Sequence, residues 1–332
     1  MADEVRFGII GLGMGLNRAR IAAKTPGVKL AVVCSIEPGK AEQVGKELGC
    51  DWTTDYEEVL ARGDVDVVGV MTPSGTHCDF AIQALQAGKH VYTTKPMDIR
   101  VEKCDAAIAA AEKAGKILAV DFDSRYNPAN HRLRMAVRSG KLGKMLAGDL
   151  LMKWYRAQSY YDGGSPPGWR SRKATEGGSI ANQGVHFVDL LQWFLGPVES
   201  VYGRSGTFGH DIETEDQTMA LLTFQSGAWG LIHTTTCSVP DLGTTIELNG
   251  TQGAILWKDN AVTLYHSAVD PESKLEDFAV DPDLPKNIIE DMASAITKGT
   301  RLQCDAHEGR KSVVIFNAIY ESSRTGKPVH IK

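Results

Sequence analysis

The chain has 332 residues, 42% of them hydrophobic and 23% charged, and its formal net charge is −5. This length exceeds what one hydrophobic core usually supports, so we expect two domains. The acidic balance argues against a nucleic-acid-binding or polybasic membrane-surface protein. No apolar run approaches the ~20 residues of a membrane helix. The N-terminus also lacks the pattern of a signal peptide, so we expect a cytoplasmic protein.

The cysteines are widely spaced, and no two of them form a CxxC pair. This spacing argues against both a zinc site and a disulfide scaffold, and it is typical of a reducing compartment. We therefore expect no metal. The six cysteines are Cys34, Cys50, Cys78, Cys104, Cys237 and Cys304.

Short apolar runs alternate with helical segments through the first third of the chain. Predicted strands cover residues 5–10, 30–34, 65–71, 91–93 and 117–120, and predicted helices start near 17 and cover 39–48, 78–87 and 102–114. Thr54 and Glu57 have the spacing of a capping box at the start of another short helix. This alternation predicts a parallel sheet of right-handed βαβ units, and we interpret residues 1–122 as a Rossmann dinucleotide-binding domain.

The pattern changes after about residue 122. Helices are predicted over 128–138 and 179–195, and closely spaced strands over 198–204, 218–224, 229–236, 244–248 and 254–257. Ser226-Gly227 and Asn249-Gly250 are typical of turns. Adjacent strands predict a large mixed or antiparallel sheet, with the last helices, 287–297 and 308–323, packed on it. Residues 123–332 are thus predicted to form an α+β domain.

A glycine turn follows the first strand and opens a helix; it consists of Gly11, Leu12, Gly13, Met14 and Gly15. Glycines here let the backbone turn tightly and approach a pyrophosphate, which the helix N-terminus attracts. We predict that this turn binds NAD or NADP; the alternative is a turn that binds nothing. Leu16 stands where the usual GxGxxG spacing has its third glycine, which predicts a turn one residue shorter.

The second strand leads into Ser35, at a position where an acidic residue would bind the adenosine ribose of NAD. Ser35 is neutral, and Lys40 follows five residues later. Both can face a 2′-phosphate, which favours NADP. The alternative is that Ser35 is only a helix-start serine and Lys40 only a solvated lysine, and the sequence does not choose between the two interpretations.

Lys95 follows a strand and so lies at the carboxyl edge of the predicted parallel sheet, where ligands bind. A lysine beside the positive nicotinamide ring could exchange protons or polarise a carbonyl. We predict a cis Lys95–Pro96 bond. The alternative for Lys95 is an ordinary surface charge.

Asn182 and His186 are four residues apart and would share one face of the predicted helix. Histidine is the natural proton carrier near neutral pH. The alternative is a buried histidine satisfied by the backbone. The preceding loop, residues 155–168, has aromatic and polar residues suited to a hydroxylated ring, and we predict Tyr155 as a substrate contact.

Together these motifs resemble the glucose–fructose oxidoreductase/inositol dehydrogenase (Gfo/Idh/MocA) family over essentially the whole chain. The resemblance rests on the following segments: Gly11-Leu12-Gly13, Thr72-Pro73-Ser74-Gly75-Thr76-His77, Gly88-Lys89-His90-Val91, Lys95-Pro96, Arg125-Tyr126-Asn127-Pro128, Trp169-Arg170, residues 177–186, and Ala318-Ile319-Tyr320-Glu321-Ser322.

The resemblance implies a Rossmann domain followed by a domain whose open sheet often builds homodimers or homotetramers. It implies catalytic roles for Lys95, Asn182 and His186, and a substrate contact at Arg125. It also implies cofactor contacts at Thr72, Pro73, His77, Thr94, Lys95, Trp169 and Arg170. The chain departs from the family pattern at Thr94, which replaces a glutamate beside the lysine, and at Asn182, which replaces an aspartate.

The sequence thus predicts an NAD(P)-dependent oxidoreductase that moves a hydride between nicotinamide and a hydroxyl-bearing carbon of a sugar, sugar derivative or cyclitol. His186 would accept the hydroxyl proton, Lys95 would stabilise charge on that oxygen, and Asn182 would orient the substrate. The roles of lysine and histidine could be exchanged. Two alternatives are a glycosidase that uses NAD for transient oxidation and a non-catalytic regulator that senses redox state.

Overall fold

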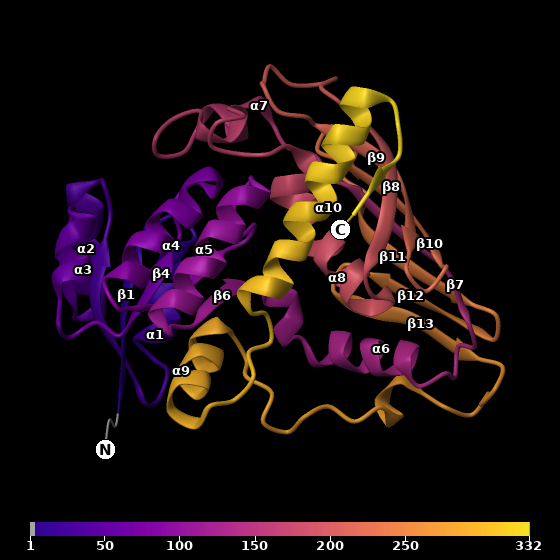
Figure 1. Ribbon diagram of the computed structural model, residues 1–332, viewed down its shortest axis with the longest axis horizontal. Helices are drawn as coiled ribbons and strands as arrows, with labels where there is room; N and C mark the ends of the chain where they lie inside the picture. Colours follow the sequence, from indigo (N-terminus) through magenta and orange to yellow (C-terminus); the bar gives the residue numbers. More distant parts are fainter. Residues whose placement is uncertain (1–3, 332) are drawn as a thin grey trace. The chain divides into compact units, whose positions relative to one another are not determined.

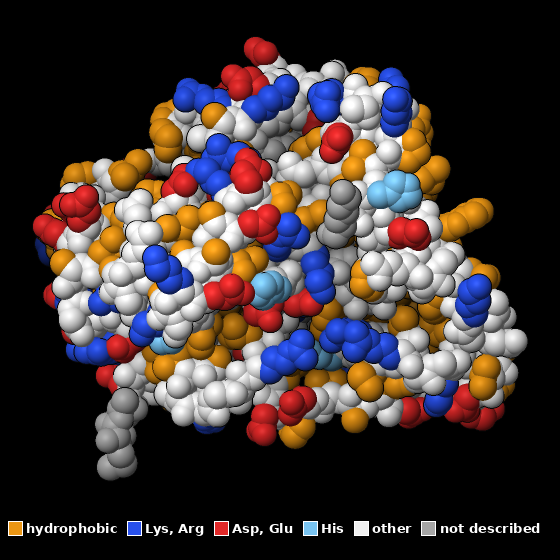
Figure 2. All heavy atoms as spheres, in the orientation of Figure 1, with side chains coloured by type: hydrophobic (Ala, Val, Ile, Leu, Met, Phe, Trp, Pro, Cys, Tyr) orange, Lys and Arg blue, Asp and Glu red, His pale blue; other side chains and the backbone are white. Residues whose placement is uncertain are grey.

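The computed structural model describes residues 4–331 (Figure 1). The chain divides into two compact units: one holds the residues up to Asp123 together with Pro285–Arg310, and the other holds Ser124–Leu284 together with the residues from Lys311 onward. None of the helices in the described range has the length and apolarity to cross a membrane. On the face drawn in Figure 2, acidic and basic side chains are interspersed.

The first unit is built on a six-stranded parallel sheet. The strands are β1 (Val5–Ile10), β2 (Val28–Cys34), β3 (Asp51–Thr53), β4 (Val67–Val70), β5 (His90–Thr94) and β6 (Leu118–Asp121). The helices are α1 (Gly15–Ala22), α2 (Pro38–Leu48), α3 (Tyr56–Ala61), α4 (His77–Gln86), α5 (Val101–Ala114) and α9 (Ile288–Lys298). The strand order is β3-β2-β1-β4-β5-β6, and all neighbours are parallel, which confirms the predicted Rossmann arrangement.

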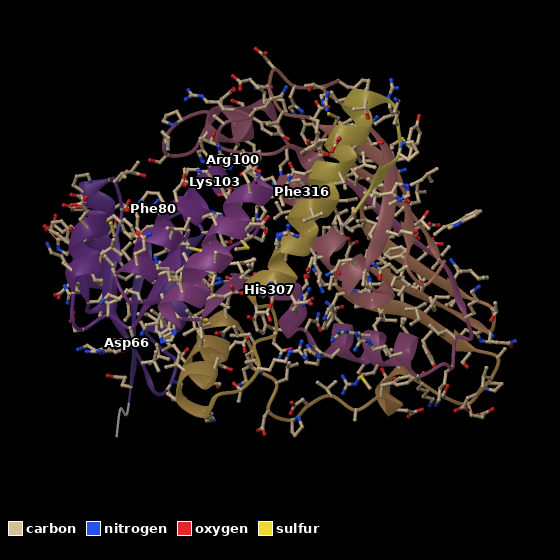
Figure 3. All side chains as sticks on the ribbon, viewed as in Figure 1. Asp66, Phe80, Arg100, Lys103, His307 and Phe316 are labelled. Atoms are coloured by element: carbon tan, nitrogen blue, oxygen red, sulfur yellow. The ribbon has the colours of Figure 1, made fainter. Side chains whose placement is uncertain are left out.

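Burial on both faces explains the apolar composition of these strands. Every residue of β4 is buried, as expected for a parallel strand covered by helices on each side. A side-chain carbon at Gly69 of β4 would lie 2.4 Å from the hydroxyl oxygen of Tyr92, so glycine is needed for the packing of that ring. On the outer surface, Lys103 of α5 forms an ion pair with Asp79 of α4 (Figure 3).

The segment that carries α9 belongs to the first unit, although the sequence predicted that this helix packs on the second sheet. In the structure α9 contacts α1 and β1. The carbonyl oxygen of Cys304 accepts a 3.0 Å hydrogen bond from the amide of Val120, and Asp305 forms an antiparallel bridge with Ala119. These backbone contacts hold the segment to β6, and a local sequence pattern does not reveal them.

The second unit is built on an eight-stranded mixed sheet. Its strands are β7 (Met145–Lys153), β8 (Val198–Gly206), β9 (Gln217–Phe224), β10 (Trp229–Thr235), β11 (Gly243–Gly250), β12 (Gly253–Lys258), β13 (Ala261–Ser267) and β14 (Val329–His330). Their order is β13-β12-β11-β7-β10-β9-β8-β14. Only the β7–β10 pair is parallel among these strands. The predicted mixed sheet is confirmed, although β7, β13 and β14 were not predicted.

The helices of the second unit are α6 (Pro128–Arg138), α7 (Gln158–Asp162), α8 (Val185–Leu195) and α10 (Ala306–Thr325), which belongs to this unit from Lys311 on (Figure 1). Helix α8 contacts β7, α6 contacts α8 and β13, and α7 contacts the short turn Trp169–Ser171. A side-chain carbon at Gly148 of β7 would lie 2.4 Å from Cδ1 of Leu195, so α8 packs closely on β7. The amide of Gly203 in β8 donates a 3.0 Å hydrogen bond to Oγ of Ser322 in α10.

Two local predictions were wrong. The cap of α3 is Asp55 and not Thr54, because the Asp55 carboxylate accepts a 2.8 Å hydrogen bond from the amide of Glu57. The Asn249-Gly250 pair is not a turn but the irregular end of β11. Glycine is needed at 250 for close approach, because a side-chain carbon there would lie 2.1 Å from the carbonyl oxygen of Leu142.

Candidate active site

The glycine turn lies where the loops after β1 and β4 meet. Gly11 has a φ of +84°, and a side-chain carbon there would lie 2.4 Å from the carbonyl oxygen of Met71. Gly15 begins α1, and a side-chain carbon there would come within 3.0 Å of Cβ of Met71. Gly13 has nothing within 4 Å of the corresponding position. Gly11 and Gly15 therefore permit close packing where the strand order reverses, and Gly13 leaves room for a ligand.

The N-terminus of α1 fits a dinucleotide diphosphate. Met14 precedes the helix, is 66% exposed and makes no side-chain cap, while its neighbour Leu12 is buried. The first turn of α1 contains no acidic residue. Uncapped N–H groups and the helix dipole attract an anion at such a terminus. The backbone of Gly13, Met14 and Gly15 would hold the diphosphate of NAD or NADP.

The end of β2 carries the residues predicted to choose between NAD and NADP. Ser35 is buried, and its Oγ accepts a 3.2 Å hydrogen bond from the amide of Glu37. Lys40 is half-buried in the first turn of α2. Sequence reasoning missed Glu37, an exposed carboxylate at the cap position of α2, because it lies two residues beyond the expected place. The positive Lys40 and the negative Glu37 therefore both lie within five residues of Ser35 in the chain.

His77 ties the loop after β4 to the loop after β5. The imidazole is fully buried, with Nδ1 2.8 Å from the carbonyl oxygen of Pro96 and Nε2 2.7 Å from that of Thr72. Burial lowers the pKa of His77 to about 4, so the ring is neutral at physiological pH. Lys95 and Thr94 are half-buried at this edge, and the Lys95–Pro96 bond is cis, as the sequence predicted. His77 thus holds the Lys95 turn in place through hydrogen bonds, and we call such a buried group a brace.

A carboxylate does act on Lys95, although Thr94 replaces the expected glutamate. Asp121 ends β6 opposite Thr94, and the positive charge of Lys95 acts to lower its pKa. Burial is the larger effect, and it raises the pKa of Asp121 to about 6 even beside Arg18 of α1, whose Nε lies 2.5 Å away. Asp121 was missed because its nearness to Lys95 arises from strand pairing.

A mostly buried helix carries the candidate catalytic residues of the second unit. It begins as a π-helical segment, Ser179–Gly184, and continues as α8, whereas one continuous α-helix was predicted. Among residues 178–195, only Asn182, Gln183 and His186 are not fully buried. The face predicted for Asn182 and His186 is therefore the one polar, accessible stripe of this helix. Gln183, which belongs to the same stripe, was missed because the predicted α-helical period places it elsewhere.

A buried acid holds the start of this helix. Glu215 is 7% exposed, and its carboxyl oxygens accept hydrogen bonds from Oγ of Ser179 at 2.7 Å, the amide of Ile180 at 2.9 Å and the hydroxyl of Tyr320 at 3.1 Å. Burial raises the pKa of Glu215 to about 7. The positioning group for Asn182 thus comes from a segment more than 30 residues away in the chain.

Tyr160 links the loop before this helix to its polar face. Its hydroxyl accepts a 2.6 Å hydrogen bond from Nε2 of Gln183 and a 3.4 Å contact from Nδ2 of Asn182. The guanidinium of Arg170 lies 4.7 Å from the centre of the Tyr160 ring and 4.6 Å from that of Trp169. Trp169 and Arg170, predicted cofactor contacts, are therefore grouped with Asn182 through Tyr160. The sequence pointed to this loop but not to Tyr160 itself.

The two predicted substrate contacts outside this group differ in exposure. Tyr155 is 47% exposed, and its amide donates a 3.2 Å hydrogen bond to Asp241. Arg125 is only 1% exposed, and its guanidinium forms two 2.8 Å hydrogen bonds with the carboxylate of Asp189 in α8. This ion pair holds Arg125 against α8, and its predicted contact with the substrate stays a prediction.

Comparison with known proteins agrees with this arrangement. The model "Oxidoreductase family, NAD-binding Rossmann fold" matches residues 5–122, and the model "GFO/IDH/MocA C-terminal domain" matches residues 130–256. The chain is 30% identical over 263 residues to scyllo-inositol 2-dehydrogenase (NAD(+)) of Bacillus subtilis, which covers 77% of this chain and 74% of that protein. It is 28% identical to 1,5-anhydro-D-fructose reductase of Ensifer adhaerens, with 98% of each chain covered.

Solved structures give the same result over the full length. The WlbA dehydrogenase from Bordetella pertussis, in complex with NADH and UDP-GlcNAcA, has a TM-score of 0.91 and 30% sequence identity, with 99% of each chain covered. Levoglucosan dehydrogenase in complex with NADH and levoglucosan shares the fold, with a TM-score of 0.85 at 21% identity and 99% of each chain covered. The chain therefore belongs to the GFO/IDH/MocA family of oxidoreductases and is an NAD-dependent enzyme of the sugar and polyol dehydrogenase type.

Proposed function

We propose that the chain moves a hydride between nicotinamide and a hydroxyl-bearing carbon of a sugar, sugar derivative or cyclitol. The observation that supports this most is the polar stripe on the buried helix, where Asn182, Gln183 and His186 alone reach the surface. Two amides and an imidazole offer both donors and acceptors, which suits a ligand with several hydroxyl groups. The guanidinium of Arg170 contacts the aromatic rings of both Tyr160, which binds this stripe, and Trp169.

The proposed roles divide between a proton carrier and groups that orient the substrate. His186 takes the proton of the reacting hydroxyl, and Lys95 stabilises the negative charge that develops on that oxygen. Asn182 binds a hydroxyl through its amide, which cannot exchange protons at neutral pH. Bound NAD(P)⁺ supplies the hydride acceptor.

The substrate class follows from what the relatives share. Three of the similar proteins are named for scyllo-inositol, 1,5-anhydro-D-fructose and levoglucosan, and the WlbA dehydrogenase is in complex with UDP-GlcNAcA. We propose a substrate of this kind, free or attached to a nucleotide. A panel of inositols, free sugars and nucleotide-linked sugars, assayed for NADH or NADPH formation by absorbance, tests the class.

One assay separates the proposed reaction from its alternatives. A dehydrogenase accumulates reduced cofactor in proportion to product, whereas a glycosidase that oxidises its substrate transiently returns the hydride and accumulates none. His186→Ala should lower turnover by a factor of ~10²–10⁴ while the dissociation constant for NADH, measured by fluorescence, stays within about twofold, because proton transfer is not part of cofactor binding. Failure of every panel member to reduce the cofactor, with NADH still bound, would contradict the proposal.

The preference for NADP is proposed to depend on the charges near Ser35. Ser35 places no carboxylate against a 2′-phosphate, and Lys40 can attract one, whereas Glu37 would repel it. Lys40→Ala should therefore weaken NADPH binding and spare NADH, and Glu37→Gln should strengthen NADPH binding. Equal effects of Lys40→Ala on both cofactors, measured as dissociation constants, would remove the basis for the preference.

We also propose a homodimer or homotetramer formed through the open face of the mixed sheet. Neighbouring strands place Tyr202, Leu221 and Leu231 in register on that face, and the first two are 42% and 60% exposed. Trp229 on the same strand as Leu231 is 72% exposed. Contiguous exposed apolar side chains of this kind mark an interface. Leu221→Lys should yield monomers in light-scattering measurements.

We also propose that the protein works in the cytoplasm. All six cysteines are free thiols, which supports the expectation of a reducing, cytoplasmic environment.

A further inference from the structure

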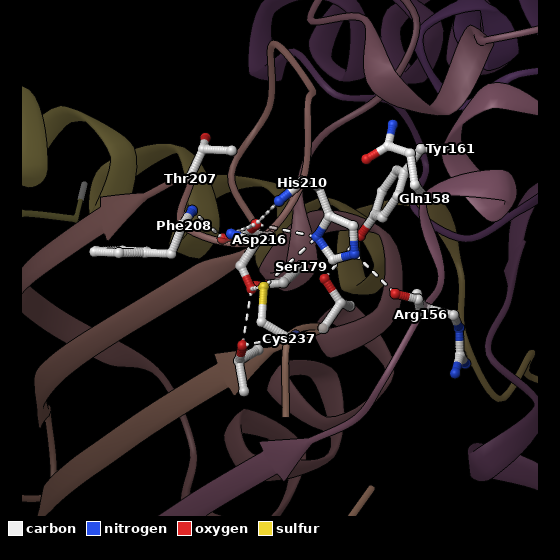
Figure 4. A network of polar contacts seen from close by, with 12 residues as sticks. Arg156, Gln158, Tyr161, Ser179, Thr207, Phe208, His210, Asp216 and Cys237 are labelled. Carbon is white, nitrogen blue, oxygen red and sulfur yellow. Dashed lines mark hydrogen bonds and ion pairs between the residues drawn. The ribbon is translucent and has the colours of Figure 1, made fainter. Parts of the chain in front are cut away.

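His210, Asp216 and Cys237 bring three different metal-binding groups together in the second unit (Figure 4). Nδ1 of His210 lies 3.0 Å from Oδ2 of Asp216 and 3.5 Å from Sγ of Cys237, and all three ligand atoms lie within 4.8 Å of one another. The side chains of His210 and Asp216 are 4% and 0% exposed, and Cys237 is half-buried. The proposed hydride transfer uses none of these residues.

The two spacings from Nδ1 of His210 are close to those of a zinc tetrahedron. Zinc lies ~2.0–2.1 Å from an imidazole nitrogen, ~2.3 Å from a thiolate sulfur and ~2.0–2.2 Å from a carboxylate oxygen. Two such ligands at a tetrahedral angle are about 3.3–3.6 Å apart. The distances from Nδ1 of His210, 3.0 Å to Asp216 and 3.5 Å to Cys237, are similar. A metal ion can therefore enter with small movements of the side chains.

The surroundings already orient two of these ligands. Nε2 of His210 lies 2.8 Å from the carbonyl oxygen of Arg156, which can accept its hydrogen when Nδ1 binds a metal ion, and Nδ1 faces the other two groups (Figure 4). The Asp216 carboxylate accepts 2.8 Å hydrogen bonds from the amides of Phe208 and Gly209. A backbone carbonyl on the second nitrogen of a histidine and hydrogen bonds on a ligating carboxylate are the usual outer contacts of a metal site.

We propose that His210, Asp216 and Cys237 bind one divalent ion of the zinc type, with the fourth position open to solvent. The mixed nitrogen, sulfur and oxygen donors favour zinc over magnesium and calcium, which prefer oxygen ligands alone. The Cys237 thiol releases its proton to solvent as the sulfur binds the metal, and the imidazole binds in its neutral form. The ion would join the segment after β8 to the segment after β10.

The test uses the full-length chain without a polyhistidine tag, with Co²⁺ as a spectroscopic probe. We expect one cobalt per chain, a thiolate-to-cobalt charge-transfer band in the near ultraviolet, and displacement of cobalt by zinc. Cys237→Ser should remove the band and weaken binding by more than the ~10–100-fold that loss of an outer partner costs. Cys50→Ser, at a half-buried cysteine of the first unit, should change neither.

Alkylation of the unsubstituted protein gives a second measurement that does not depend on the folding of a variant. Zinc should slow the reaction of Cys237 with iodoacetamide, followed by peptide mass spectrometry, and leave the reaction of Cys50 unchanged. Cobalt binding without a thiolate band, equal affinity in Cys237→Ser, or an alkylation rate of Cys237 that zinc does not change would each overturn the proposal.

Discussion

In the first unit the Lys95 turn is held by a buried base, and in the second unit the Asn182 segment is held by a buried acid. His77 contacts two backbone carbonyl oxygens, and Glu215 accepts hydrogen bonds from Ser179 and Ile180. Burial opposes the charged form in both cases, so it lowers the pKa of His77 to about 4 and raises that of Glu215 to about 7. The same physical effect therefore moves the two groups in opposite directions.

This difference gives the two braces opposite effects on stability. Between pH 6.5 and about 4 the unfolded chain binds a proton at His77 more readily than the folded chain does, so stability falls as the pH falls. Between pH 4.5 and about 7 the folded chain holds the proton on Glu215 more tightly, so stability falls as the pH rises. The contributions of the two groups largely cancel where these windows overlap.

The largest expected effect is the loss of kcat when the candidate catalytic residue of either unit is replaced. Lys95→Ala and His186→Ala should each lower kcat by a factor of ~10²–10⁴, because a positioned proton carrier or charge-stabilising group contributes about that much. The pH profile of kcat/KM identifies the proton carrier: the variant that loses the acidic limb has lost the base. Near-normal turnover in both variants would place the chemistry elsewhere.

A second prediction compares two glycines of the same turn. Gly11→Ala forces a side chain against the carbonyl of Met71 at positive φ, and we expect it to lower the free energy of unfolding by about 2–4 kcal/mol. Gly13→Ala has open space, so it should change the free energy of unfolding by less than ~0.5 kcal/mol yet weaken NADH binding. Urea unfolding and NADH titration check the pair. A stable Gly11→Ala chain would show that the turn is more adaptable than its packing indicates.

The third prediction tests the opposed pH dependences directly. Glu215→Gln removes a buried acid whose stabilising effect is lost as the pH rises. When the pH is raised from 4.5 to 8, the free energy of unfolding of the variant, compared with that of the unsubstituted chain, should therefore increase by about 3 kcal/mol. His77→Gln should instead gain relative stability as the pH falls from 7 to 4. Urea unfolding at several pH values measures both. A flat difference for Glu215→Gln would refute the assignment.

The smallest expected effect concerns the contact between the loop and the helix in the second unit. Tyr160→Phe removes the hydroxyl that accepts from Gln183 and Asn182, so we expect KM for the substrate to rise about 2–10-fold with little change in kcat. Tyr161→Phe loses a 2.7 Å hydrogen bond to Thr236 instead and should affect stability but not KM. Equal KM values for the two variants would indicate that Tyr160 does not orient the polar stripe.

Much of the first unit could be predicted because its signals are local. The apolar runs, the glycine turn and the position of Lys95 after a strand all lie within short segments, and connectivity alone places them at one edge of a parallel sheet. Asp121 shows the limit, since its effect on Lys95 depends on which strands pair. The Arg125 motif shows another limit: its partner Asp189 is 64 residues away, so the sequence did not reveal this ion pair.

The sequence by itself determined the alternation that specifies the Rossmann unit, the mixed-sheet class of the second unit, and the candidates Lys95, Asn182 and His186. Tertiary structure alone decided that α9 returns to the first unit and that Glu215 and Tyr160 position the polar helix face. It also decided that His210, Asp216 and Cys237 meet without any ligand spacing in the sequence. The physical reason is that periodicity and turn chemistry act over a few residues, whereas contacts between distant segments depend on strand order and on how side chains fill the core.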